Sequence, residues 1–123
     1  MYTLDTNTII YYSKGDAHVT KILEDIFSKG TPLYISSITE IELFGFPHLT
    51  GEDSRWFENF LKAVTVIPVD SRLARIAGSI RRQYRLKTLD SVIAATALAT
   101  GTTLVTRNTR DFKGVPDLAV LKI

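Results

Sequence analysis

The chain has 123 residues, which is enough for one hydrophobic core and too few for two, so we expect a single domain spanning residues 1–123. The absence of cysteine excludes disulfides, zinc–thiolate sites, iron–sulfur clusters and cysteine nucleophiles, and with only two histidines any metal needs oxygen ligands. No apolar run approaches the roughly 18 residues of a membrane span, and the N-terminus lacks the basic start of a signal peptide. We therefore expect a cytoplasmic protein without membrane contact.

The net charge of +2 hides an uneven distribution. Residues 1–60 carry nine acids and four bases, whereas residues 61–123 carry four acids and eleven bases. The densest basic stretch lies just before Asp90 and contains Arg81, Arg82, Arg85 and Lys87. Such a patch suits either a polyanionic substrate held near a metal or a solvated helix end, where bases are favourable beside the dipole.

Strands and helices alternate along the chain. In order, we predict a strand at 2–5, a helix at 17–28, a strand at 33–36, helices at 37–46 and 52–62, a strand at 64–69, helices at 71–84 and 90–100, and strands at 103–106 and 119–123. The strands are continuously apolar or β-branched, as parallel strands covered on both faces tend to be. This pattern predicts a three-layer α/β/α fold with a central parallel sheet of four to five strands.

Several residues that favour the start or the end of a helix support these bounds. Gly30 and Gly101 suit the ends of the helices 17–28 and 90–100, and Asp70 or Ser71 suits the start of the helix 71–84. The helix 90–100 is apolar all round, which predicts that it is buried. We expect residues 48–53 to form a flexible loop.

Four acids stand in apolar settings: Asp5, Glu42, Asp90 and Asp111. Asp5 ends the first strand, Asp90 opens a helix, Glu42 follows the second strand by about two helical turns, and Asp111 comes shortly after Thr106. Functional groups of an open parallel sheet collect beyond the carboxyl ends of its strands. The arrangement could therefore bring all four acids to one edge.

Each acid taken alone also has a structural explanation. Asp5 and Asp90 are suitable helix N-caps, and Asp111 suits a polar turn. Glu42 is harder to explain, because it shares a helical face with Ile38 and so points inward. The joint spacing of the four acids is what favours a common site.

Clustered carboxylates repel one another and take up protons unless a cation compensates their charge. One or two Mg²⁺ or Mn²⁺ ions would resolve that conflict. Such ions lower the pKa of bound water and polarise phosphoryl oxygens, which suits phosphodiester hydrolysis without histidine or cysteine.

The four acidic segments together resemble the PIN-domain nucleases, and most closely the toxin ribonucleases of VapBC toxin–antitoxin pairs. The matching pieces are LDTN at 4–7, TEIEL at 39–43, LDSVIAATA at 89–97 and TRNTRDF at 106–112. The likeness extends over nearly the whole chain in order and spacing. It implies a PIN-like fold and cleavage of single-stranded or structured RNA that depends on Mg²⁺ or Mn²⁺.

The resemblance also assigns roles to residues. It implies that Asp5 and Asp90 are the principal metal ligands and that Glu42 is a further ligand or the base for the attacking water. The fourth acid of the family falls at Asn108 or Asp111, and we favour Asp111. The expected polar supports are Thr6, Asn7, Thr106 and Asn108, and the possible RNA contacts are Arg81, Arg82, Arg85 and Lys87.

Partners follow from the same resemblance: an RNA substrate, a second copy in a homodimer, and a VapB-like antitoxin whose C-terminal segment fills a groove near the site. The aromatic residues that could form this groove are Phe44, Phe46, Trp56, Phe57 and Phe60. Aromatic residues at helical spacing are also ordinary core residues, so both interpretations stand.

Other classes fit less well. A haloacid-dehalogenase-type site needs a second aspartate where this chain has Asn7, and a receiver domain needs an acidic pair where Asp5 stands alone. No glycine-rich loop with Lys-Ser or Lys-Thr is present, which excludes a P-loop nucleotidase. A non-catalytic PIN-like module that binds RNA or protein is the main alternative to a nuclease.

Overall fold

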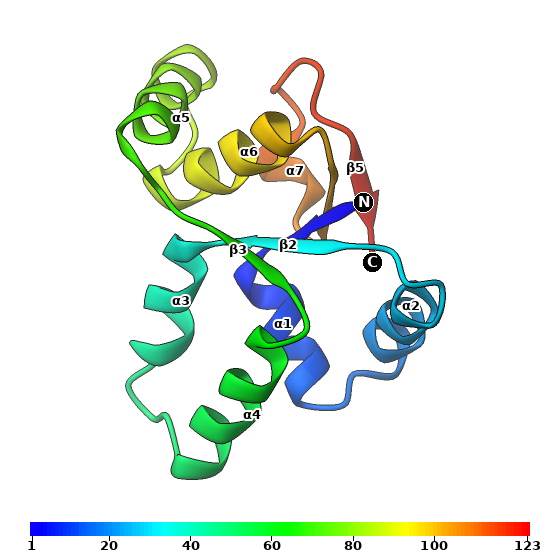
Figure 1. The fold of residues 1–123 in the computed structure, drawn as a ribbon. Helices are drawn as coiled ribbons and strands as arrows, with labels where there is room; N and C mark the ends of the chain where they lie inside the picture. Colours follow the sequence, from blue (N-terminus) through cyan, green and yellow to red (C-terminus); the bar gives the residue numbers. More distant parts are fainter.

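The computed structural model describes residues 1–123 and shows a five-stranded sheet between two layers of helices (Figure 1). The strands are β1 (Tyr2–Leu4), β2 (Leu33–Ser36), β3 (Thr65–Ile67), β4 (Thr103–Thr106) and β5 (Val120–Lys122). Their order is β3-β2-β1-β4-β5, and every neighbouring pair is parallel. The predicted three-layer α/β/α fold is confirmed, with five strands.

The helices are α1 (Thr6–Ser13), α2 (Ala17–Ser28), α3 (Ser37–Phe44), α4 (Gly51–Leu61), α5 (Ser71–Tyr84), α6 (Thr88–Thr100) and α7 (Thr109–Phe112). In Figure 1, α5, α6 and α7 lie above the sheet, and α1 to α4 lie below it. None of them is both long and apolar enough to cross a membrane.

Each face of the sheet has its own hydrophobic cluster. Leu104 packs with α5 and α6, whereas its neighbour Val105 packs with α1, α2 and α4. Successive side chains of a strand point to opposite faces, so a strand covered by helices on both faces must be apolar at every position. This explains why the strands read as continuous apolar runs.

The predicted bounds are correct for α2, α5, β2 and β4. The residues expected at the helix ends are largely confirmed in that position. Asp70 caps α5 by accepting a 2.9 Å hydrogen bond from the Leu73 N–H. Gly101 ends α6 with a left-handed φ of 64°, a conformation that is inexpensive only for glycine. Residues 91–97 of α6 are all buried, as predicted from the apolar composition of this helix.

Other predictions need correction. The helices α1 and α7 were not predicted, because both are short and neither carries an apolar stripe of sufficient length. Residues 51–53 are the first turn of α4 and not part of a loop, because Thr50 and Asp53 form a reciprocal capping box. The helix α6 begins at Thr88, two residues before the predicted start, so Asp90 lies in its first turn.

Candidate functional site

A cavity of about 300 Å³ lies where β1, β2 and β4 lead into the helices that follow them. Twelve residues line it: Asp5, Thr6, Asn7, Glu42, Lys87, Thr88, Leu89, Asp90, Ile93, Asn108, Asp111 and Phe112. The structure therefore brings all four predicted acids to the wall of one cavity. Asp5, Glu42 and Asp111 lie on segments that follow β1, β2 and β4, and parallel strands end at the same edge of their sheet, whereas Asp90 comes from the start of α6, which follows α5.

Asp5 is a buried carboxylate held on both oxygens. Its Oδ1 accepts hydrogen bonds from the Thr8 N–H at 2.9 Å and the Thr8 hydroxyl at 2.6 Å. Its Oδ2 accepts a 2.5 Å bond from the Thr106 hydroxyl. Asp5 is thus the N-cap of α1 and also lines the cavity. Its role as a helix cap does not prevent it from contributing to a site.

Glu42 extends from the last turns of α3 toward α1. Its Oε1 accepts a 2.5 Å hydrogen bond from the hydroxyl of Thr6, the first residue of α1. The Thr6 hydroxyl also lies 3.2 Å from that of Thr39, one turn earlier on α3. The inward orientation predicted for Glu42 is confirmed, and its hydrogen-bond donor is Thr6, one of the predicted polar supports.

Asp90 does not cap its helix, since Lys87 occupies the N-cap position without a side-chain hydrogen bond. Burial raises the pKa of Asp90, and the negative charge of Asp111 raises it further. Asp5 and Glu42 add smaller effects in the same direction, while Lys87 opposes them. Burial and the three neighbouring acids together outweigh Lys87, so the charged form of Asp90 is disfavoured in the metal-free chain.

Asp111 is exposed on α7 and accepts a short hydrogen bond from the Asn108 side-chain amide. The Asn108 N–H in turn donates to the Thr106 hydroxyl at 3.0 Å. Thr106 therefore links Asp5 to the segment that carries Asp111. The two candidates for the fourth acidic position lie side by side in the cavity, and of the two only Asp111 carries charge.

Two threonines behind the acids were not predicted, and most of the predicted basic residues lie outside the cavity wall. Thr8 and Thr39 were not predicted to contribute, although the third helical position after an N-cap aspartate is a signal that could have found Thr8. Asn7 lines the cavity as an exposed residue. Of the predicted basic residues, only Lys87 lines the cavity, and Arg81, Arg82 and Arg85 are exposed at the end of α5.

The donor set of the cavity fits an oxygen-coordinated divalent cation. It offers four carboxylates, hydroxyl and amide oxygens, and neither histidine nor cysteine. No three acidic or histidine side chains of the chain are gathered into a ready-made metal-binding group. An ion in the cavity would therefore need water or substrate phosphates to complete its oxygen ligands.

Residues 2–118 match the PIN domain family, so the chain belongs to this family. It is 28% identical over 123 residues to the ribonuclease VapC19 of Mycobacterium tuberculosis, with 96% of this chain and 97% of that protein covered. It is 31% identical over 131 residues to the ribonuclease VapC1 of Rickettsia felis, with 98% and 94% covered.

Solved structures give the same relationship. A chain of the VapBC2 complex of Rickettsia felis, crystallised with a DNA fragment from their promoter, superposes with a TM-score of 0.84. The sequence identity is 27%, and the match covers 99% of this chain and 98% of that chain. Fold and sequence therefore agree on likeness to VapC proteins over nearly the full length.

Proposed function

We propose that this protein is an endoribonuclease that depends on Mg²⁺ or Mn²⁺, hydrolyses RNA phosphodiester bonds and serves as the toxin of a toxin–antitoxin pair. The observation that carries the proposal is the cavity with four carboxylates at the strand ends of a PIN-domain fold. The similarity to ribonucleases of the VapC group supports the same activity.

The proposed roles follow from the contacts of each acid. Asp5 and Asp90 are the principal metal ligands, and Asp111 completes the site from α7. These residues would hold a Mg²⁺ or Mn²⁺ ion, which would supply a water molecule of lowered pKa and polarisation of the scissile phosphate. Glu42 keeps one oxygen on Thr6 and has the other free to accept a proton from the attacking water.

The test is incubation of the pure protein with labelled RNA in Mg²⁺, in Mn²⁺ and in EDTA. We expect cuts with either metal, none in EDTA, and recovery when metal is returned in excess. RNA binding without cuts in every metal would favour the non-catalytic binding module instead. Cuts that persist in EDTA would contradict the metal dependence.

The basic end of α5 is the proposed RNA contact. Arg81 and Arg82 lie in its last turn and are exposed, and the chain then runs through residues 85–87 to the cavity wall. Positive side chains along such a path attract the phosphates that flank the cut bond. The electrostatic attraction brings RNA to the cavity, while the acids perform the chemistry.

Replacing Arg81 and Arg82 by glutamine should therefore raise KM for RNA and leave kcat nearly unchanged. The slope of log KM against log salt should fall by about 0.7 for each lost phosphate contact with single-stranded RNA. The matched control replaces Arg72 and Arg75, which are exposed near the start of the same helix. Equal effects of both double variants would contradict a local contact.

The aromatic cluster divides into core and surface. Phe57 and Phe60 are buried, whereas Phe46 is 48% exposed beside a small apolar cavity of about 30 Å³ that Ile10 and Leu43 also line. The core interpretation is thus confirmed for the two buried rings. We propose the face around Phe46 as the contact for a VapB-like antitoxin, because an exposed aromatic next to an apolar pocket is a typical anchor point.

Phe46→Ser is expected to weaken binding of a VapB-like antitoxin roughly tenfold or more, the usual cost of losing an aromatic anchor. Titration calorimetry with the purified antitoxin measures it. Ile41→Ser is the control, since Ile41 is 67% exposed on α3 and does not line the pocket. Unchanged affinity of the Phe46 variant would place the antitoxin elsewhere.

A further inference from the structure

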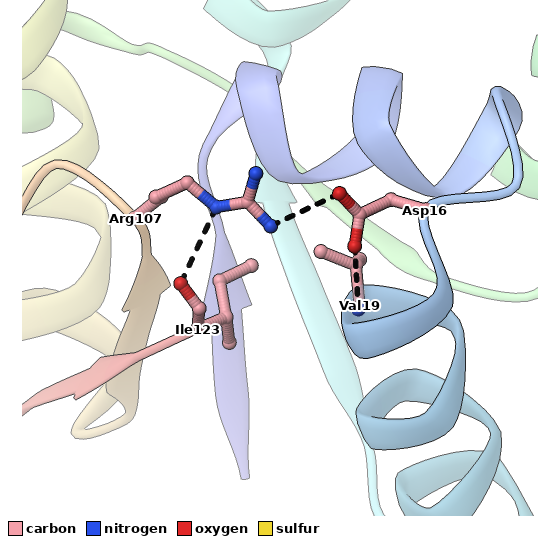
Figure 2. A network of polar contacts seen from close by, with 4 residues as sticks. All are labelled: Asp16, Val19, Arg107 and Ile123. Atoms are coloured by element: carbon pink, nitrogen blue, oxygen red, sulfur yellow. Dashed lines mark hydrogen bonds and ion pairs between the residues drawn. The ribbon is translucent and has the colours of Figure 1, made fainter.

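Arg107 connects three parts of the chain that are distant in sequence (Figure 2). Its Nε donates to the carbonyl oxygen of Ile123 at 3.3 Å, and its Nη2 lies 3.2 Å from Oδ2 of Asp16. The guanidinium carbon also lies 4.3 Å from the ring centroid of Tyr11, a cation–π distance. Arg107 therefore contacts α1, the start of α2 and the residue after β5.

The Asp16 partner is itself held in place. Its Oδ1 caps α2 by accepting a 3.1 Å hydrogen bond from the Val19 N–H, as Figure 2 shows. The pKa of Asp16 is lowered, first by that hydrogen bond and then by Arg107, so the ion pair is charged at neutral pH. Both side chains remain partly exposed, at 40% for Arg107 and 29% for Asp16, and exposed ion pairs add little to stability.

The residues on either side of Arg107 each hold an acid that lines the cavity. Thr106 donates to Asp5, and Asn108 donates to Asp111. Residue 107 forms a bend just past β4, and the contacts of its side chain lie on α1, Asp16 and Ile123 and not on the acids. The parallel ladder to β5 ends with the hydrogen bond from Ile123 N–H to Thr106 at 3.3 Å. Beyond that point the Arg107 side chain ties the segment to Tyr11, Asp16 and Ile123.

We infer that Arg107 is a positioning residue: by tying the end of β4 to Asp16, Tyr11 and Ile123, it fixes the backbone from which Thr106 and Asn108 orient two acids of the cavity. The inference rests on the proposed function for what those acids do. The anchoring itself is a property of the chain without metal and can be measured there.

Arg107→Met is the principal variant, because methionine keeps an apolar stem and loses all three contacts. Hydrogen exchange of the amides of residues 107–112 in the metal-free chain should become faster. Mn²⁺ affinity, measured by electron paramagnetic resonance, should fall about tenfold, the lower end of the cost of losing support behind metal ligands. At saturating Mn²⁺, kcat for RNA cleavage should fall. KM, obtained by varying the RNA concentration, should stay unchanged.

Lys29→Met is the matched control. It removes the other ion pair of the chain, between Lys29 at the C-cap of α2 and Asp25 at 2.9 Å, which has no contact with the cavity. We expect this variant to keep wild-type exchange at residues 107–112 and wild-type Mn²⁺ affinity. If the Arg107–Asp16 pair were purely structural, Arg107→Met would at most lower the unfolding temperature and would change neither the exchange nor the Mn²⁺ affinity.

Asp16→Asn provides a second, milder variant that retains an oxygen to cap α2 and loses the charge that faces Arg107. It should change both readouts in the direction of Arg107→Met, and the double variant should be no worse than Arg107→Met alone, because the two residues act through one contact. Additive losses, or unchanged exchange in Arg107→Met, would overturn the inference. If the wild-type chain neither bound Mn²⁺ nor cut RNA, the proposed function would fail, and hydrogen exchange would still decide the role of Arg107.

Discussion

Asp5→Asn should lower kcat for RNA cleavage by at least about a hundredfold, or roughly 2.7 kcal/mol of transition-state stabilisation. Asparagine has nearly the same shape and keeps an oxygen to accept the Thr8 N–H at the start of α1. What it lacks is the negative charge that would bind a divalent cation. The expected loss is therefore one of chemistry and not of folding, measured as kcat in Mn²⁺ together with the unfolding temperature.

Asp70→Asn is the control for this experiment. Asp70 caps α5 with the same geometry as Asp5 caps α1, through a 2.9 Å bond from the Leu73 N–H, and it does not line the cavity. The control variant should cut RNA at the wild-type rate. If Asp5→Asn retained wild-type kcat, the assignment of Asp5 as a metal ligand would be wrong, whatever the fate of the fold.

The second large effect is the change in folding stability caused by Asp90→Asn, which we expect to be positive without metal and negative with it. Burial and the neighbouring acids raise the pKa of Asp90 above its ordinary value of 3.8, so the folded metal-free chain binds this proton more tightly than the unfolded chain. Its stability should therefore fall as the pH rises from about 3.8 through the raised pKa. Asp90→Asn removes this loss of stability, because asparagine does not ionise. The metal-free variant should therefore be more stable than the metal-free wild type at neutral pH.

Metal should invert that order. Mn²⁺ at one hundred times its dissociation constant should stabilise the wild-type chain by about 2.7 kcal/mol, whereas the variant gains little because it has lost a ligand. Thermal unfolding of both proteins at pH 4 and at neutral pH, in EDTA and in Mn²⁺, measures how their stability depends on pH and on metal. Glu58→Gln, an exposed change on α4, should follow wild type throughout. A variant that gains as much from Mn²⁺ as wild type does would rule Asp90 out as a ligand.

Local pattern in the sequence was sufficient for much of the architecture. The bounds of α2 and α5 follow from their apolar stripes and their caps, and the buried strands follow from continuous apolar runs. The helix α1 was not predicted, because its β-branched threonine and isoleucine residues are weak helix formers. Its ordering comes from the Asp5 cap and from burial of Thr8 and Ile9 against the sheet layer.

The four acids could also be selected from the sequence, because charge in an apolar setting is costly and therefore informative. Which hydroxyl holds which acid could not be predicted. Thr106 is 101 residues from Asp5, and Thr6 is 36 residues from Glu42. The division of the aromatic cluster into buried rings and an exposed Phe46 likewise has no local signal.

The sequence alone thus determined the layers, the family and the acids, since each depends on periodicity or on a short run of residues along the chain. Only the tertiary structure revealed the hydroxyls behind the acids, the link from Arg107 to Asp16, and the absence of a ready-made group of three metal ligands. These features depend on the distances between helices that meet at one edge of the sheet. Such distances are set by side-chain packing across two hydrophobic clusters, which no local pattern records.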